Sequence, residues 1–174
     1  MLTRSAIPTR RLATAAVAGV SAVALLAGCG MTTKQQAAAV VNGSVIHQDE
    51  VEVAAHQLSQ LGFNEQGVVL ALIASPMLIK QVDTSGSWKP DATYATLLAR
   101  IPDATQATKD TLAAAALLES GAMTPADVAG YRKALDAAHI SLNPKYGEVK
   151  KSNTGPLYFT LGAATPNWIA APSK

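Results

Sequence analysis

The sequence predicts a mainly α-helical single domain of about five helices, with a small two-stranded β element. Alanine is abundant among the hydrophobic residues, which make up 49% of the chain, whereas aromatic residues make up only 5%. This composition is typical of helices that pack through small side chains. Apolar residues also recur at helical spacing in several segments. The part of the chain after residue 28 is about 145 residues long, which suffices for one domain with its own core.

The predicted domain begins with a short extended segment and a helix. Residues Ala38–Ile46 are rich in valine and isoleucine, and the Asn42-Gly43 pair within them is a signal for a tight turn. A helix is expected to begin after His47 and to end at Gly62. Its buried stripe follows the i, i+3, i+4, i+7 rule and consists of Val51, Ala54, Ala55 and Leu58.

A second helix, capped by Asn64, is expected to be apolar around nearly its whole circumference. Its apolar residues are Val68, Val69, Leu70, Leu72, Ile73, Met77, Leu78 and Ile79. Such a helix either forms the centre of the core or meets a partner. In the second case Val69, Ile73 and Met77 are the candidate residues for binding unfolded polypeptide. Pro76 lies inside this helix and is expected to kink it.

Three further helices and a short strand complete the predicted domain. The helices are expected at Asp91–Ile101, at Thr105–Ser120 and after the Thr124-Pro125 pair, which combines a cap with proline at the first helical position. The strand is expected around residues 140–142, before an Asn-Pro turn. Residues 148–174 are rich in proline, glycine and polar residues and are expected to form a flexible tail.

The amino terminus has the layout of an export signal. Arg4, Arg10 and Arg11 form a basic opening, and the apolar run Leu12–Leu26 follows. This run is about 15 residues long, shorter than the roughly 20 that a membrane-spanning helix needs. Residues 1–28 are therefore predicted to be a removable signal. Twin-arginine export is a weak alternative, because the residues after the arginine pair do not continue that motif.

The end of the signal, Leu-Ala-Gly-Cys at residues 26–29, resembles the lipobox of bacterial lipoproteins. The resemblance implies cleavage before Cys29, a diacylglyceryl group on its thiol, and a location on the outer side of the cell membrane. Residues 29–36 would then be a tether. The alternatives are cleavage by the ordinary signal peptidase and a buried cysteine. Cys29 is the only cysteine of the chain, so the domain can form no internal disulfide.

Three stretches resemble the amino-terminal chaperone domain of SurA-type and PrsA-type proteins, which is related to the peptide-binding part of trigger factor. Residues 39–46 read AVVNGSVI and lead into QDEV at 48–51, similar to the opening strand, turn and helix of that family. Residues 68–82 look like its long second helix. Residues 140–147 read ISLNPKYG and resemble the closing strand and turn of actinobacterial lipoproteins of this group. The resemblance covers residues 37–147.

The resemblance implies an extracytoplasmic domain in which the first strand pairs with the returning last strand and helices surround both. It also implies chaperone-like binding of exported polypeptides without catalysis. The parvulin isomerase domain of some relatives needs about 90 more residues, so a peptidyl-prolyl isomerase is the less favoured expectation. An accessory envelope lipoprotein that binds one specific partner is the alternative. The sequence departs from the family at His47, where threonine is usual, and at Pro76.

Composition argues against several other classes of function. The predicted signal holds three of the 14 Lys and Arg residues and none of the 12 Asp and Glu residues, so the exported chain is slightly acidic. No basic patch of the kind that binds nucleic acid is expected. We found no metal-binding, phosphate-binding or nucleophile motif, so we expect no enzyme activity, metal or cofactor.

Overall fold

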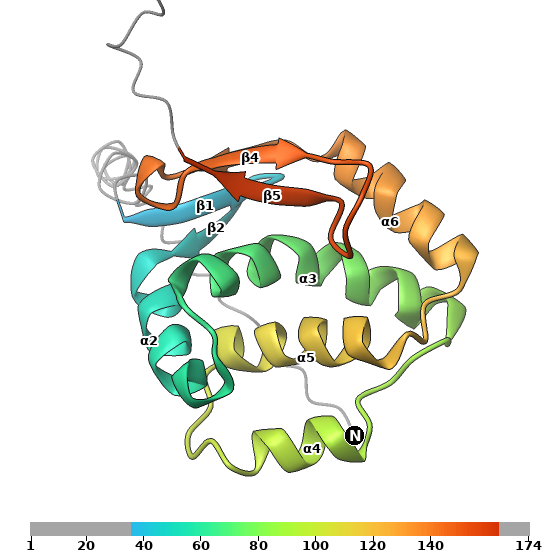
Figure 1. Ribbon diagram of the computed structural model, residues 1–174, viewed down its shortest axis with the longest axis horizontal. Helices are drawn as coiled ribbons and strands as arrows, with labels where there is room; N and C mark the ends of the chain where they lie inside the picture. The colour runs from blue at the N-terminus through green and yellow to red at the C-terminus, as the bar shows by residue number, and fades with distance from the viewer. Residues whose placement is uncertain (1–35, 164–174) are drawn as a thin grey trace, which may run out of the picture.

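The computed structural model describes residues 36–163 of the chain, and residues 1–35 and 164–174 lie outside the described part. The described part holds five α-helices, a three-stranded sheet and a separate two-stranded hairpin (Figure 1). The prediction of a mainly helical domain of about five helices is therefore confirmed. The β structure is more extensive than expected, because the carboxy-terminal hairpin adds a second sheet.

The domain opens with the strands β1 (Ala37–Val41) and β2 (Ser44–His47), which pair in antiparallel fashion. The two residues between them, Asn42 and Gly43, have φ angles of 51° and 88°. Positive φ at both central residues is what a two-residue turn between twisted strands requires, and Asn-Gly adopts it at low cost. The predicted turn is thus confirmed.

The third strand, β3 (Ile140–Leu142), returns from the far end of the domain and pairs antiparallel with β1, giving the order β2-β1-β3. The pairing is extended at both ends, since the amide of Asn42 donates to the carbonyl of His139 and the amide of Asn143 donates to the carbonyl of Ala38 (both 2.9 Å). The side chain of Asn42 also accepts from the His139 amide at 2.9 Å. This is the pairing of first and returning strands that the resemblance implied.

Helix α2 (Gln48–Leu58) starts directly after β2, with His47 at the N-cap position. The carboxylate of Glu50 accepts from the His47 amide at 3.1 Å, which satisfies one of the free donors at the helix start. A 3-10 turn (Ser59–Leu61) follows, and Gly62 ends it in the left-handed conformation. Both boundaries agree with the prediction.

Helix α3 (Glu65–Ser85) is the central element, capped by the Asn64 side chain, which accepts from Gly67 at 2.8 Å. It packs against α5 and α6, and also contacts α2, β1 and the hairpin. Figure 1 shows it lying between the hairpin and α5. By length and composition α3 could cross a membrane, but its apolar side chains are accounted for by the core that they form. The helix continues past Pro76 rather than ending there.

The remaining helices cover α3. They are α4 (Ala92–Leu98), α5 (Gln106–Ser120) and α6 (Pro125–Ala137). The residue before each helix caps it. A side-chain oxygen of Asp91, Thr105 and Thr124, respectively, accepts a hydrogen bond from a backbone amide in the first helical turn. Helix α5 packs on both α2 and α3, and α4 packs on α5, on the side away from the sheet (Figure 1). Alanine at four consecutive positions of α5 permits close approach between these helices.

The expectation of a flexible tail after residue 147 is wrong for the described residues. Strands β4 (Glu148–Lys151) and β5 (Phe159–Gly162) form an antiparallel hairpin that covers α3 and lies beside α6 (Figure 1). Phe159 is buried in the core. The hydroxyl of Tyr131 donates to the Leu157 carbonyl at 2.8 Å, and the Lys151 amine donates to the Leu135 carbonyl at 2.9 Å. Residues 164–174, the rest of the predicted tail, lie outside the described part.

Candidate functional site

The three residues predicted to bind polypeptide, Val69, Ile73 and Met77, all lie in the core. Val69 and Ile73 have no exposed surface, and Met77 is 7% exposed. They are covered because α3 is enclosed by several elements rather than by one. The expectation that they form an open binding groove is therefore wrong, and the alternative of a central core helix is correct. Cys29, the predicted lipidation site, lies outside the described residues.

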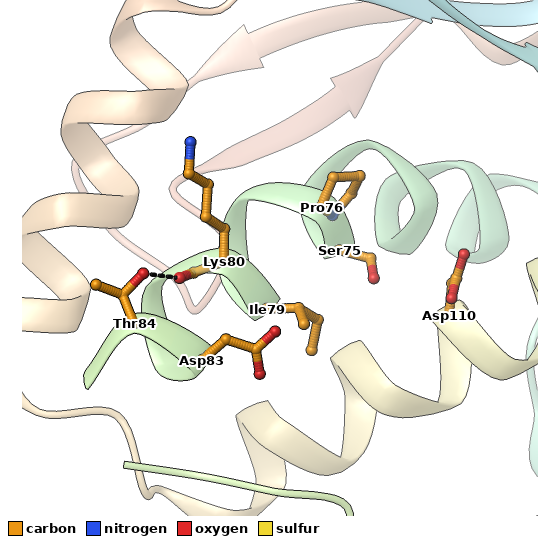
Figure 2. Close-up of a pocket in the computed structure, with 7 residues that line it drawn as sticks. All are labelled: Ser75, Pro76, Ile79, Lys80, Asp83, Thr84 and Asp110. Atoms are coloured by element: carbon orange, nitrogen blue, oxygen red, sulfur yellow. Dashed lines mark hydrogen bonds between the residues drawn. The ribbon is translucent and has the colours of Figure 1, made fainter. Parts of the chain in front are cut away.

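One hollow of the described surface lies between α3 and α5 and has a volume of about 520 Å³ (Figure 2). We call it the helix hollow, and it is lined by Ser75, Pro76, Ile79, Lys80, Asp83, Thr84 and Asp110. Six of these residues come from the outer side of α3. In Figure 2 the carboxylates of Asp83 and Asp110 lie on either side of Ile79, whereas the Lys80 side chain extends away from α5. The helix hollow thus has an apolar middle, with one carboxylate at each end.

Asp110 of α5 interacts with two other residues of the described part. The amide group of the Gln106 side chain donates to the Asp110 carboxylate at 2.7 Å. On the α4 side, burial and, secondly, the Asp110 carboxylate raise the pKa of Tyr94 above its usual value. The Asp110 carboxylate therefore lines the helix hollow and acts electrostatically on Tyr94.

A second hollow, of about 400 Å³, runs along β1 and β3. We call it the sheet hollow, and it is lined by Ala37, Ala39, Val40, Ser141, Leu142, Asn143 and Pro144. It adjoins the side of the sheet that carries Val40, Val45 and Ser141, which are aligned by the strand register. We call these three residues the outer face. Val45 is 39% exposed, and neither valine belongs to the core cluster.

Both edges of this sheet lack a neighbouring strand within residues 36–163. The backbone groups of His139 and Asn143 form hydrogen bonds toward β1. Because the direction of the backbone groups alternates along an antiparallel strand, the N–H and C=O groups of Ile140 and Leu142 point away from β1. Polar backbone groups next to apolar side chains are what an extended polypeptide segment needs in order to add to a sheet.

A buried carboxylate lies at the start of α6, but its surroundings indicate a structural role. Asp127 is 4% exposed, and its Oδ2 accepts from the Thr124 amide (2.8 Å), the Thr124 hydroxyl (2.7 Å) and the Ser87 hydroxyl (2.9 Å). The hydrogen bonds from Thr124 first, and those from Ser85 and Ser87 after them, lower the pKa of Asp127 to about 2. A carboxylate with three hydrogen bonds to one oxygen and a lowered pKa is a weak base, so it is poorly suited to proton transfer.

The Asn-Pro-Lys-Tyr-Gly turn at residues 143–147 fastens the returning strand to the helices. The Asn143 side chain donates to the Ala37 carbonyl at 3.1 Å. The Lys145 amine forms ion pairs with Glu52 of α2 at 3.3 Å and with Glu65 of α3 at 2.9 Å. The hydrogen bonds to Glu65 and Glu52 raise the pKa of Lys145 above its usual value. These residues close the domain beside the sheet hollow.

The hairpin and α6 enclose a third, polar hollow of about 280 Å³, beside Tyr158. Tyr158 has a φ angle of 55°, a strained value for a bulky residue. The Arg132 guanidinium lies 4.9 Å from the centre of its ring, and the Tyr131 ring packs at 6.4 Å. Because Arg132 and Tyr131 already pack against this ring, the arrangement holds the hairpin loop on α6.

Within residues 36–163 no three His, Cys, Asp or Glu side chains lie close enough together to hold a metal ion. The three histidines occupy separate places: His47 caps α2, His56 lies in the last turn of that helix, and His139 precedes β3.

The sequence patterns did not predict the helix hollow or the sheet hollow. The outer face could have been found from the period-two alternation of strands, because Val40 and Val45 lie at matching distances from the Asn42-Gly43 turn. The acidic pair of the helix hollow gives no such local signal, since Asp83 and Asp110 belong to different helices. Searches for similar proteins returned no match: no family model, no curated protein and no solved structure matches this chain.

Proposed function

We propose that this protein is a lipid-anchored, extracytoplasmic lipoprotein that binds extended segments of exported polypeptides without catalysis, in the manner of a chaperone. The observation that carries the proposal is the outer face and the adjoining sheet hollow, where apolar side chains and free backbone groups occur together. An extended segment placed there gains main-chain hydrogen bonds from a strand edge and apolar contact with Val40. Neither contribution requires a particular client sequence.

The order of the elements supports a relationship to the SurA-type and PrsA-type chaperone domain. A strand, an Asn-Gly turn and a second strand lead into α2, and the long α3 follows. The returning β3 pairs with β1 and ends in the Asn-Pro-Lys-Tyr-Gly turn. We propose this relationship on the connectivity and on the motifs together, because a mainly helical fold alone does not fix function.

The membrane anchor is proposed from the sequence. A basic opening, a short apolar run and a small-residue exit precede Cys29. Because β1 begins at Ala37, the tether would place the start of the sheet at most roughly 30 Å from the lipid, at about 3.3–3.6 Å per residue. The sheet would then be held near the membrane surface, where exported chains emerge.

The proposal is tested by asking whether the exported chain, made without lipid, suppresses aggregation of a chemically unfolded client. We expect suppression at a several-fold excess, measured by light scattering. Ser141→Glu introduces a charge into the sheet hollow at an exposed position and should abolish most of the effect, because burying an unpaired carboxylate opposes apolar contact. Thr160→Glu is the matched control, since it is also an exposed strand residue but lies on β5.

Failure of the unaltered protein to suppress aggregation at that excess would contradict the proposal. Equal loss of activity in both variants would show that the outer face is not the binding surface. Recovery of one stoichiometric partner from membranes, in place of a broad mixture of exported chains, would favour the accessory-protein alternative.

A further inference from the structure

The sheet hollow differs from the helix hollow and from the hollow beside Tyr158 because no charged side chain lines it. Its apolar lining is formed by Ala37, Ala39, Val40, Leu142 and Pro144. The exposed Ser141 adds a hydroxyl oxygen that can accept a hydrogen bond. Such a lining favours a neutral occupant that is mostly apolar and has a single donor.

The described part of the chain ends close to this hollow. Gly162 of β5 is the register partner of Glu148 at the start of β4, so their Cα atoms are about 5 Å apart. Glu148 directly follows the Asn-Pro-Lys-Tyr-Gly turn, in which the Gly147 amide donates to the Pro144 carbonyl at 3.1 Å. Because Pro144 lines the sheet hollow, the chain beyond Gly162 starts near the rim of that hollow.

The residues that follow have the chemistry that the sheet hollow favours. Residues 164–174, which we call the carboxy-terminal segment, read ATPNWIAAPSK and lie outside the described part. Only Lys174 is charged, and Trp168 is the largest apolar residue of the segment. An indole ring combines a large apolar surface with one N–H donor. Trp168 is six residues beyond Gly162, a stretch that can span up to roughly 20 Å.

We propose that the carboxy-terminal segment of the same chain occupies the sheet hollow by inserting the indole ring of Trp168. The ring packs against Val40 and Pro144, and its N–H group donates to the Ser141 hydroxyl oxygen. The inference rests on the proposed polypeptide-binding function and adds an internal competitor to it. An exported polypeptide must displace Trp168 before it can bind to the outer face.

The first test measures acrylamide quenching of tryptophan fluorescence in the exported chain that carries Cys29→Ser. The only other tryptophan of the chain, Trp88, is buried, so the difference from Trp168→Ser isolates the emission of Trp168. We expect Ser141→Glu to raise the quenching constant of Trp168 several-fold, because it introduces a charge where the ring packs. Thr160→Glu, on β5, is the matched control and should leave the constant unchanged.

The second test measures client affinity by fluorescence anisotropy of fluorescein-labelled, carboxymethylated α-lactalbumin, which is permanently unfolded. Trp168→Ser should bind this client at least about threefold more tightly than the unaltered chain, because an occupied surface lowers the apparent affinity by the fraction that is free. Asn167→Ser alters the neighbouring residue and is the matched control. Trp168→Ser changes no residue of the described part, so this test remains valid if Ser141→Glu fails to fold.

Three results would overturn the inference. The first is quenching of Trp168 in the unaltered chain as strong as that of free tryptophan amide, or equal quenching in Ser141→Glu and Thr160→Glu. The second is protection of Trp168 that disappears on dilution, because the hollow would then take the segment of a second copy. The third is equal affinity of Trp168→Ser and Asn167→Ser in a protein that binds the client.

The outcomes separate this inference from the proposed function. Protection of Trp168 that Ser141→Glu abolishes, without any client binding or suppression of aggregation, contradicts only the proposed chaperone-like function. Suppression of aggregation by a chain whose Trp168 is freely quenched contradicts only the internal competitor.

Discussion

Asp127 illustrates how single residues hold this domain together. Its carboxylate joins the end of α3 to the start of α6, because it accepts from Ser87 in the connecting loop and from Thr124 at the cap. The polar contacts of Asp127 thus indicate a structural role for this residue. The perturbed pKa of a buried acid is in this case a sign of architecture rather than of catalysis.

Asp127 should make the stability of the domain dependent on acid. Its folded-state pKa of about 2 lies below the usual 3.8, so its contribution is present in full above pH 4 and is lost as the pH falls toward 2. Asp127→Ala should therefore lower the melting temperature at neutral pH, and the gap to the unaltered protein should narrow between pH 4 and pH 2. Thermal denaturation followed by circular dichroism measures both.

The control for this prediction is Asp136→Ala, an exposed acid on the same helix, which should leave the melting temperature nearly unchanged. A gap for Asp127→Ala that stays constant down to pH 2 would show that the carboxylate is not held in its ionised form.

At the scale of elements, α3 packs against most of the other helices and strands, and it contains Pro76. Proline has no N–H, so the Leu72 carbonyl lacks the helical donor that it would otherwise have. Pro76 is exposed at the surface of the helix hollow, where loss of that bond exposes the backbone to solvent rather than to the core. The helix tolerates the residue because its neighbours on the inner side, Met77 and Leu78, remain buried.

Pro76→Ala should therefore stabilise the domain. The restored hydrogen bond and better helix propensity contribute up to about 3 kcal/mol, and the greater freedom of the unfolded chain offsets roughly 0.4–1 kcal/mol of this. Urea unfolding measures the difference. A lower free energy of unfolding for the variant would mean that the proline ring makes packing contacts that outweigh the missing bond.

Sequence patterns predicted the elements with strong local signals. The Asn42-Gly43 turn and the helix starts at Asn64 and Thr124 were predicted because a turn or cap depends on a few neighbouring residues. Helix α3 was predicted as an apolar helix, but periodicity could not decide whether its apolar side faces a groove or other helices. That depends on α5 and α6, which are distant in sequence.

At the scale of the whole molecule, the hairpin shows that composition alone did not predict whether a segment is folded. Residues 148–162 are rich in polar residues, glycine and proline, which predicted a tail. Their order arises from distant contacts, above all the Tyr131 hydroxyl to the Leu157 carbonyl and the Lys151 amine to the end of α6. The same holds for the helix hollow and the sheet hollow, because each is lined by residues from distant parts of the chain.

The proposed lipid anchor would determine where the whole molecule acts. If Cys29 carries the lipid, Cys29→Ser should move the protein from the membrane fraction to the soluble extracytoplasmic fraction, because serine has no thiol and the chain has no other cysteine. Cell fractionation followed by immunoblotting measures this. Continued tight attachment of the variant to membranes would show that the anchor has been assigned to the wrong residue.

The central claim is that extended polypeptide binds at the outer face of the three-stranded sheet. The most direct measurement is amide hydrogen exchange of the exported chain, with and without an excess of a permanently unfolded, alkylated client. If extended polypeptide binds there, amide exchange should slow at Ile140 and Leu142, whose N–H groups point away from β1, and should change little in the buried helix α3. Unchanged exchange in β3, together with protection confined to another surface, would contradict it.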